Sequence, residues 1–469
     1  MPSQTDPSAD EAGHDAWLKA AARSLKGADL GSLVTRTVEG VEIQPLYDAA
    51  PAAERLRTVV GWDIRACVRA SAPEAANALA HEALGGGATS LLLQGGFASA
   101  ADVAGALDGV VLEAAPVALD AGFGGPQAAA WLGEAAKGSP SALLALHLDP
   151  LGAFAQAGQS PGPIEAHLHS AAKVGAALAG AYPEASLFLA SGRVAHEAGG
   201  SPAQELGVMA AATVTYARAA TDAGLGMDAA LSKIVLGLSV DQQLLVSVAK
   251  IRAARRIWAR IVGACGARAQ ARIEVRSSDR MLTAADPWTN LLRLTAAGMA
   301  GALGGADAMV LGTFTDALGE PAERARRLAR NTQLILAEEA HLSRPSDAMA
   351  GAWAIESLTD QLARQGWNCF QAIERQGGLL VMLTSGLLAA EVAAVGAARE
   401  AAVSEAEMPI LGVNRFVDPD PLPVEVETPS SPPAPLPAAQ LPGPDSYCPR
   451  LSPVRISTIA EQVSEDLQP

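Results

Sequence analysis

The chain of 469 residues is poor in cysteine, in aromatic side chains and in long uncharged apolar runs. Four cysteines with no close pair exclude a disulfide scaffold and a cysteine-based zinc or iron–sulfur cluster. No apolar run reaches the roughly 18 residues that a membrane helix needs. Aromatic residues make up 4% of the chain, so its 49% hydrophobic content consists mainly of alanine, leucine and valine. This content is ample for a large buried core.

Basic residues are outnumbered, with 34 Lys and Arg against 50 Asp and Glu, which leaves a formal net charge of −16. Phosphate groups repel such a chain, so the balance argues against binding to nucleic acid or an anionic membrane. The first basic residue, Lys19, follows Asp6, Asp10, Glu11 and Asp15. A secretory signal opens instead with positive charge and an apolar stretch. We therefore expect a soluble cytoplasmic protein.

The common signatures of catalysis and cofactor binding are also missing. The sequence has no G-x-G-x-x-G, no Walker A, no H-E-x-x-H, no G-x-S-x-G and no C-x-x-C. These absences remove the simplest dinucleotide, phosphate, zinc and serine-nucleophile interpretations. We interpret the glycine-rich segments 85–87, 122–125 and 304–305 as tight turns and close packing sites rather than anion cradles.

Charge and proline content divide the chain. Residues 1–15 are polar and acidic and are predicted to be disordered. Residues 16–408 carry nearly all of the periodic apolar signal. Residues 409–469 hold 14 of the 30 prolines, a density that predicts a coiled or polyproline-like tail because proline removes a backbone donor.

The middle region alternates short apolar runs with longer segments of helical spacing. The predicted strands are Ile64–Val68, Ser90–Leu93, Val110–Leu112, Leu143–His147, Ser186–Ala190, Ile234–Gly237, Ile273–Arg276 and Met309–Gly312. Helices are predicted between them, and further ones over Ala322–Ala340, Ala354–Arg364 and Leu380–Ala401. Continuous apolar strands that alternate with helices indicate a parallel sheet covered by helices. Eight strands favour a closed (β/α)8 TIM barrel over residues 61–408, with an open doubly wound sheet as the alternative.

Four histidines are candidates for chemistry. His147 ends a predicted strand, where barrel enzymes place catalytic groups, although a satisfied half-buried histidine is the simpler interpretation. His167 and His169 have metal-ligand spacing but no nearby cysteine or acidic ligand, so a surface pair is favoured. His196 lies between a strand and a helix and would need a partner to act as a base, because Glu197 beside it points elsewhere.

Two basic clusters, Lys250–Arg260 and Arg324–Arg330, fall on predicted helices with an apolar stripe opposite. We interpret both as solvated helix faces or subunit contacts rather than phosphate sites.

Two sets of segments, in order along residues 16–415, carry a family resemblance. The N-terminal set is Trp17–Leu18, Ser24–Leu30, Leu33–Thr37, Gly40–Tyr47 and Gly61–Arg65. The downstream set is Ala198–Gly199, Ala203–Leu206, Ala249–Arg260, Met281–Thr283, Asp286–Trp288, Asn290–Arg293, Gly304–Asp307, Asn331–Glu339 and Leu411–Asn414. Together they resemble the methylmalonyl-CoA mutase family. The resemblance implies a TIM barrel and the rearrangement of an acyl-CoA thioester by adenosylcobalamin radical chemistry.

The sequence departs from the catalytic pattern of this family at the mouth of the barrel. Where the pattern reads Ser-Gly-Tyr-His, Arg193 replaces the tyrosine and Val194 the histidine, and valine can neither donate a hydrogen bond to a thioester nor face a corrin. Three further motifs, Asn-x-His-Asn, His-Thr-Gln-Thr and Thr-Ile-Arg-Gln-Tyr, are replaced by Ser239–Gln242, Glu274–Ser277 and Asp63–Cys67. His196 and Gly199 match part of the Asp-x-His-x-x-Gly loop that ligates cobalamin, but Val194 stands where the aspartate is required.

The resemblance therefore implies the small, non-catalytic (beta) subunit of a heterodimeric mutase, with no catalytic, cofactor-binding or metal-binding residues of its own. Its partner would be the large catalytic subunit, which would hold adenosylcobalamin and the acyl-CoA substrate. Residues 16–60 would form an N-terminal extension that contacts that subunit. Family chains continue after the linker into a flavodoxin-like domain, whereas this sequence ends at Pro469 within or just past its proline-rich segment, so we expect it not to bind a corrin.

Two alternatives stay open at this point. The chain could be an acyl-CoA-binding accessory protein of the mutase system. It could also be a stand-alone acyl-CoA mutase-like enzyme with a rebuilt mouth that uses His147, His196, Arg193 and Arg276. The sequence does not reveal whether small side chains leave the bore open to a pantetheine arm or large ones close it.

Overall fold

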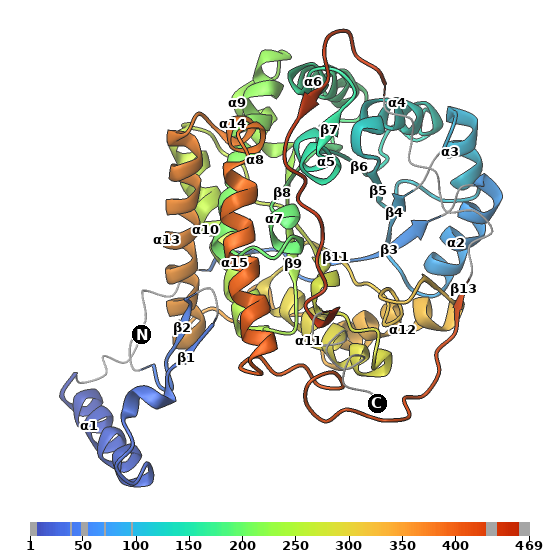
Figure 1. Ribbon diagram of the computed structural model, residues 1–469. Coiled ribbons are helices and arrows are strands. Elements are labelled where there is room, and N and C mark those ends of the chain that lie inside the picture. The colour runs from blue at the N-terminus through green and yellow to red at the C-terminus, as the bar shows by residue number, and fades with distance from the viewer. Residues whose placement is uncertain are drawn as a thin grey trace.

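The computed structural model describes residues 7–37, 40–47, 55–69, 72–94, 97–427 and 439–458. Eight parallel strands close into a barrel in the order β10-β11-β3-β4-β5-β6-β8-β9, and helices surround it (Figure 1). The closed sheet confirms the predicted (β/α)8 TIM barrel and rules out the open doubly wound alternative.

Seven of the eight predicted strands coincide with barrel strands, and the third prediction was wrong. Val110–Leu112 lies in a turn where Val111 is 62% exposed, and the strand begins instead after Pro116. Alanine within Val117–Asp120 weakens the apolar signal that would have marked that strand. The barrel strands are β3 (Asp63–Arg69), β4 (Ser90–Gln94), β5 (Val117–Asp120), β6 (Leu144–Leu148), β8 (Ser186–Ser191), β9 (Ile234–Val240), β10 (Ile273–Ser277) and β11 (Ala308–Val310).

Helices follow the strands around the barrel. They are α2 (Pro73–Gly85), α3 (Ala100–Ala106), α4 (Gly125–Ala135), α5 (Pro150–Ala157), α6 (Ile164–Ala181), α7 (Arg193–Glu197), α8 (Pro202–Asp222), α9 (Met227–Ser232), α10 (Leu244–Ala264), α11 (Asn290–Gly304) and α12 (Glu323–Leu334). Short turns of other helix types are η2 (Gly122–Gly124), η3 (Asp279–Met281), η4 (Pro287–Thr289) and the π-helical η5 (Ile335–Glu339).

Local sequence explains where several helices begin. The side chain of Ser201 accepts a hydrogen bond from the Gln204 amide while the Gln204 side chain accepts one from the Ser201 amide, so this capping box and Pro202 start α8. The Asp149 side chain caps α5 by accepting a hydrogen bond from the Gly152 amide, ahead of Pro150. The Asp149-Pro150 pair therefore opens a helix directly after β6.

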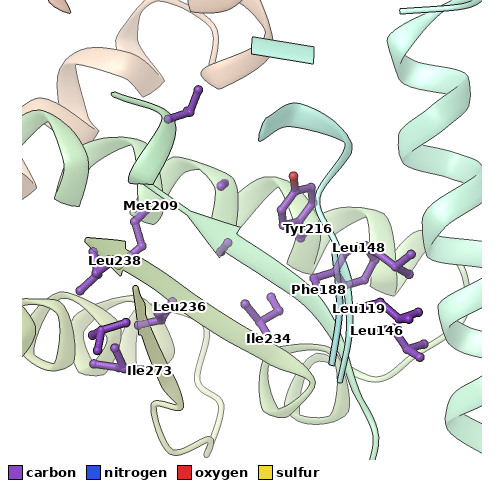
Figure 2. Packing of buried hydrophobic residues seen from close by; sticks show 14 of the residues in the cluster. Leu119, Leu146, Leu148, Phe188, Met209, Tyr216, Ile234, Leu236, Leu238 and Ile273 are labelled. Atoms are coloured by element: carbon purple, nitrogen blue, oxygen red, sulfur yellow. The ribbon is translucent and has the colours of Figure 1, made fainter. Parts of the chain in front are cut away.

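The apolar core lies mainly between the barrel and its helices. Figure 2 shows Leu146 of β6, Phe188 of β8 and Tyr216 of α8 in this shell, and the Phe188 and Tyr216 rings are stacked with centroids 5.0 Å apart. Residues on alternate positions of the strands point into the bore instead. The apolar cluster there is small, and its buried members are Leu92, Ala118, Ala145 and Val310.

Three helices after the barrel extend this core. They are α13 (Trp353–Arg375), α14 (Leu379–Thr384) and α15 (Leu387–Ser404), and Gly386 at φ +78° separates the last two. α13 packs closely along α8, because Gly366 lets the backbone of α13 approach Leu206.

The N-terminal part differs from the predicted disorder. Helix α1 (Pro7–Ser24) begins inside residues 1–15, because alanine and glutamate in this acidic stretch favour a helix. The turn η1 (Leu30–Leu33) and the pair β1 (Thr35–Arg36) and β2 (Glu42–Ile43) follow, and α1 stands away from the barrel in Figure 1. Residues 1–6 lie outside the described residues. Among the described helices, none combines the length and apolarity needed to cross a membrane.

The tail after α15 is extended, as its prolines predict, but it lies on the barrel rather than apart from it. It forms two short antiparallel pairs, β12 (Glu320–Pro321) with β13 (Val426–Glu427) and β7 (Gln159–Ser160) with β14 (Ser446–Tyr447). Residues 446–458, which we call the strap, continue from β14, and the Leu451 amide donates to the Ala155 carbonyl at 2.9 Å. Residues 428–438 and 459–469 lie outside the described residues.

We expect Gly366→Ala to lower the free energy of unfolding by about 1–3 kcal/mol, because its Cβ would stand 2.6 Å from Leu206 Cβ and overpacking carries a cost of that order. Gly180→Ala in α6 is the matched control: nothing lies within 4 Å of its Cβ, and the change should stabilise by about 0.5–1 kcal/mol. Urea unfolding of both variants checks this. Equal stability of the two would contradict the close contact between α8 and α13.

Candidate functional site

A network of ion pairs crosses the bore of the barrel, and its side chains are buried except for that of Asp120. Glu274 of β10 pairs with Arg65 of β3, and the Arg276 Nε atom donates to the same carboxylate at 2.8 Å. Arg276 Nη1 lies 2.5 Å from an oxygen of Asp120 on β5. We call these four side chains the plug. Because β3, β5 and β10 lie on different sides of the barrel, the plug spans its interior.

Further hydrogen bonds fix the plug in place. Gln94 donates to Asp120 at 2.6 Å, and the Arg65 Nε atom donates to Ser90 Oγ at 3.1 Å. Burial alone would raise the pKa of Glu274, but Arg276 and Arg65 outweigh burial and hold that pKa well below its usual range. The pKa of Asp120 is lowered as well, since Arg276 and Gln94 offset its burial. Both carboxylates of the plug are therefore ionised at neutral pH.

His147 lies beside the plug at a distortion of β6. Its φ is +45°, in the left-handed region, and the pairing of β6 with β8 shifts by one residue there. Its ring is buried, its Nε2 atom is 3.6 Å from Glu274, and neither ring nitrogen has a hydrogen-bond partner among the described residues. Burial lowers the pKa of His147 to about 4, so the ring is neutral near pH 7.

A cavity of about 170 Å³ adjoins His147. Its lining includes the first residues of five strands, so it lies toward the N-terminal end of the bore: Asp63, Leu144, Ser186, Ile273 and Ala308. Catalytic groups of TIM barrels lie at the opposite, C-terminal end. His147 thus lies near the end of a strand, as the sequence predicts. Its side chain lines the cavity at the N-terminal end of the bore, and the plug separates it from the C-terminal mouth.

His196 belongs to a second buried network on the C-terminal side. Its Nδ1 atom is 3.1 Å from the Glu205 carboxylate, and its Nε2 atom is 2.8 Å from Ser278 Oγ. Lys250 Nζ also approaches Glu205, at 2.5 Å. Burial, with Arg280 and Lys250 nearby, lowers the pKa of His196 well below its usual value. The ring is enclosed by protein groups and is not presented to a ligand.

The remaining candidates are dispersed as well. Arg193 lies 3.5 Å from Glu197 in α7, and Val194 beside it is buried. His147, with Arg276, lies in the bore, and His196 lies in the network around Glu205. The structure therefore does not bring the four residues of the stand-alone enzyme hypothesis into one site.

Two sequence interpretations need correction. His167 is not on the surface: it is buried in α6, where it contacts the Phe123 ring at 4.8 Å and the Pro161 carbonyl at 2.9 Å, while His169 is exposed. No group of three metal-ligating side chains occurs among the described residues. The first half of the Lys250–Arg260 cluster is also buried rather than solvated, because its cations pair with carboxylates of neighbouring elements.

Sequence reasoning missed the carboxylates that organise both networks, Glu205 and Asp120. Glu205 lies in α8, whose sequence has the pattern of an ordinary amphipathic helix. The partners of the Glu205 carboxylate come from α7 and α10. A signal for the plug was present, because Glu274 and Arg276 place two charges on the same face of an apolar strand.

The strap crosses the C-terminal mouth above these networks. The Val454 amide donates to the Glu197 carbonyl at 2.8 Å, and the Ile456 amide donates to the Arg280 carbonyl at 3.2 Å. Ser457 is buried, and its hydroxyl donates to the Leu282 carbonyl at 3.2 Å. In Figure 1 the red strap runs across the barrel face that carries α7. The strap therefore joins the loops that follow β8 and β10.

Comparison with known proteins gives one consistent family. A family profile described as methylmalonyl-CoA mutase matches residues 95–433. The methylmalonyl-CoA mutase small subunit of Streptomyces virginiae is 36% identical over 91% of this chain and 74% of its own length. A probable small subunit from Mycobacterium bovis is 35% identical over 82% of this chain and 66% of its own length. The methylmalonyl-CoA mutase of Escherichia coli is 32% identical over 50% of this chain.

We expect Glu274→Gln to lower the free energy of unfolding by about 3–5 kcal/mol at pH 7, because two buried guanidinium groups lose their shared counter-ion. The lowered pKa of Glu274 means that its stabilising effect is present above the ordinary carboxyl pKa and is lost as the pH falls. The difference from wild type should therefore shrink below about pH 4.

Glu134→Gln is the matched control, because it breaks an exposed pair with Lys137 and should change stability by less than about 1 kcal/mol. Chemical unfolding across pH 3–8 measures both variants. A Glu274→Gln variant as stable as Glu134→Gln would show that the plug is not the ionised network described.

Proposed function

The chain belongs to the methylmalonyl-CoA mutase family, and we propose that it is the small, non-catalytic subunit of a heterodimeric, adenosylcobalamin-dependent methylmalonyl-CoA mutase. A related large subunit would carry out the interconversion of methylmalonyl-CoA and succinyl-CoA, and this chain would stabilise it in the cytoplasm. Small-subunit relatives, which match most of this chain, support the assignment.

The plug is the observation that carries the proposal. A pantetheine arm needs a continuous passage if a thioester is to reach the mouth through the barrel. Arg65, Glu274, Arg276 and Asp120 occupy that passage with charges that are paired with one another. Displacing them would leave buried charges without partners, at a cost of several kcal/mol. This supports a barrel kept for its shape rather than for substrate binding.

The mouth does not fit a corrin either. A corrin ring requires an open face above the barrel, whereas the strap lies there and its Val454 and Ile456 amides bond to the loops after β8 and β10. At the two positions where the catalytic pattern has Tyr and His, this chain has Arg193, which contacts Glu197, and the buried Val194. These observations support placing adenosylcobalamin on the large subunit.

The N-terminal extension supports a role in subunit contact. No residue of α1 with a described side chain is buried, and its apolar residues Trp17 and Leu18 are only partly covered. In Figure 1 α1 extends away from its own barrel. Apolar side chains that their own chain covers only partly are typical of a segment that packs on another chain.

Co-expression with the large subunit of the same organism tests the proposal. We expect the two chains to elute together in equal amounts and the mutase activity to require the large subunit. This chain alone, supplied with adenosylcobalamin and methylmalonyl-CoA, should show no turnover. Separate elution of the two chains, or rearrangement by this chain alone, would overturn the proposal.

A further inference from the structure

An exposed apolar surface surrounds Phe416, and we propose that it is the docking surface for a segment of the large subunit that carries apolar side chains flanked by lysine or arginine. This inference rests on the proposed function and adds the location of the contact to it. We call the surface the Phe416 patch. Its members are Leu292, Leu411, Phe416, Val417 and Leu422.

Two hydrogen bonds bring the segments that carry these residues together although they are far apart in sequence. Leu292 lies in the first turn of α11, and its neighbour Arg293 donates from Nη2 to the Leu411 carbonyl at 2.6 Å. The Trp288 indole N–H, just before α11, donates to the Leu422 carbonyl at 3.1 Å. The start of α11 and the chain after α15 therefore lie side by side.

The apolar side chains of the patch are strongly exposed. Phe416 is 84% exposed, and Leu292 and Leu422 are each 70% exposed. Burying a side chain of this size from water is worth roughly 1.5–3 kcal/mol, so exposing three of them together is unfavourable unless a partner covers them.

Contacts on both sides of Phe416 hold its loop in place. The exposure of the Phe416 ring therefore does not come from a loop without contacts. Val413 is buried beneath it against Val403, and the Asn414 side chain accepts a hydrogen bond from the Ile410 amide at 2.6 Å. Gly412 lies against Asp286. Phe416 itself has φ +52°, a left-handed conformation that is uncommon for a bulky residue and is often maintained at functional positions. The backbone therefore holds this ring outward.

The segment after Phe416 is stiffened in the same way. Pro419, Pro421 and Pro423 alternate with Asp420 and Leu422. Each proline fixes its own φ and restricts the preceding residue to extended conformations. A partner that binds this segment orders little additional chain, which reduces the entropic cost of association.

The charge around the patch specifies the partner. Between residues 405 and 427 the sequence has six carboxylates and one basic residue, Arg415. Asp418, Asp420 and Glu425 are exposed beside the apolar residues. A protein surface that is complementary to an apolar centre with an acidic rim presents apolar side chains flanked by lysine or arginine. The same rim repels nucleic acid and anionic membranes, so we assign the patch to a protein partner.

The test measures binding of the full chain to the purified large subunit by surface plasmon resonance. We expect the double variant Phe416→Ser/Leu422→Ser to bind at least tenfold more weakly, because the apolar centre of an interface carries most of its binding energy. Asp418→Lys/Asp420→Lys should slow association and reduce its dependence on salt. Val111→Ser is the matched control, since Val111 is 62% exposed outside the patch, and it should bind like wild type.

The outcomes separate the two proposals. If the wild-type chain binds the large subunit and Phe416→Ser/Leu422→Ser binds equally well, with unchanged melting temperatures, the patch assignment is wrong and the proposed function stands. If the wild-type chain does not bind the large subunit, the proposed function itself fails. Equal losses in Phe416→Ser/Leu422→Ser and in Val111→Ser would also reject the patch, because the effect would not depend on position.

Discussion

The ion pairs between Glu274 and the guanidinium groups of Arg65 and Arg276 hold together the side chains at the centre of the barrel. Charged groups lose their hydration inside a protein, so they are stable there only when each finds a counter-ion with good geometry. Here the closed barrel supplies that geometry, because it places β3 two strands from β10 and β5 opposite β10. The arrangement fills the centre of the bore with paired charges, and under the proposed function it closes the passage that a long acyl carrier would need.

The second network, around His196, is likewise built from buried polar groups that contact one another. An imidazole between a carboxylate and a serine hydroxyl is an arrangement that enzymes use for proton transfer. In this chain Lys250 shares the carboxylate of Glu205, the surroundings hold the ring neutral, and the strap covers the loop that follows. The residues thus join helices to strands beneath the mouth. Under the proposed function, the side chains at this end of the barrel stabilise the scaffold.

Much of the fold could be predicted from the sequence, because buried parallel strands are continuous apolar runs and their helices have a clear period. The prediction failed at Val110–Leu112, where three apolar residues lie in a loop, and the short strand β5 was missed. The candidate site was harder to predict from the sequence than the fold. Arg65 and Glu274 are 209 residues apart, and only closure of the barrel makes them partners. Similarly, Glu197 follows His196 directly, yet the partner of that ring is Glu205, because helix geometry and not sequence adjacency decides which side chains meet.

The most direct measurement is isothermal titration of the purified chain with coenzyme A and with an acyl-CoA thioester. If the paired charges close the bore, neither compound should give saturable binding at millimolar concentration. Saturable binding of one thioester per chain at micromolar concentration would show that the bore opens, and it would contradict the view that this barrel has been kept for its shape.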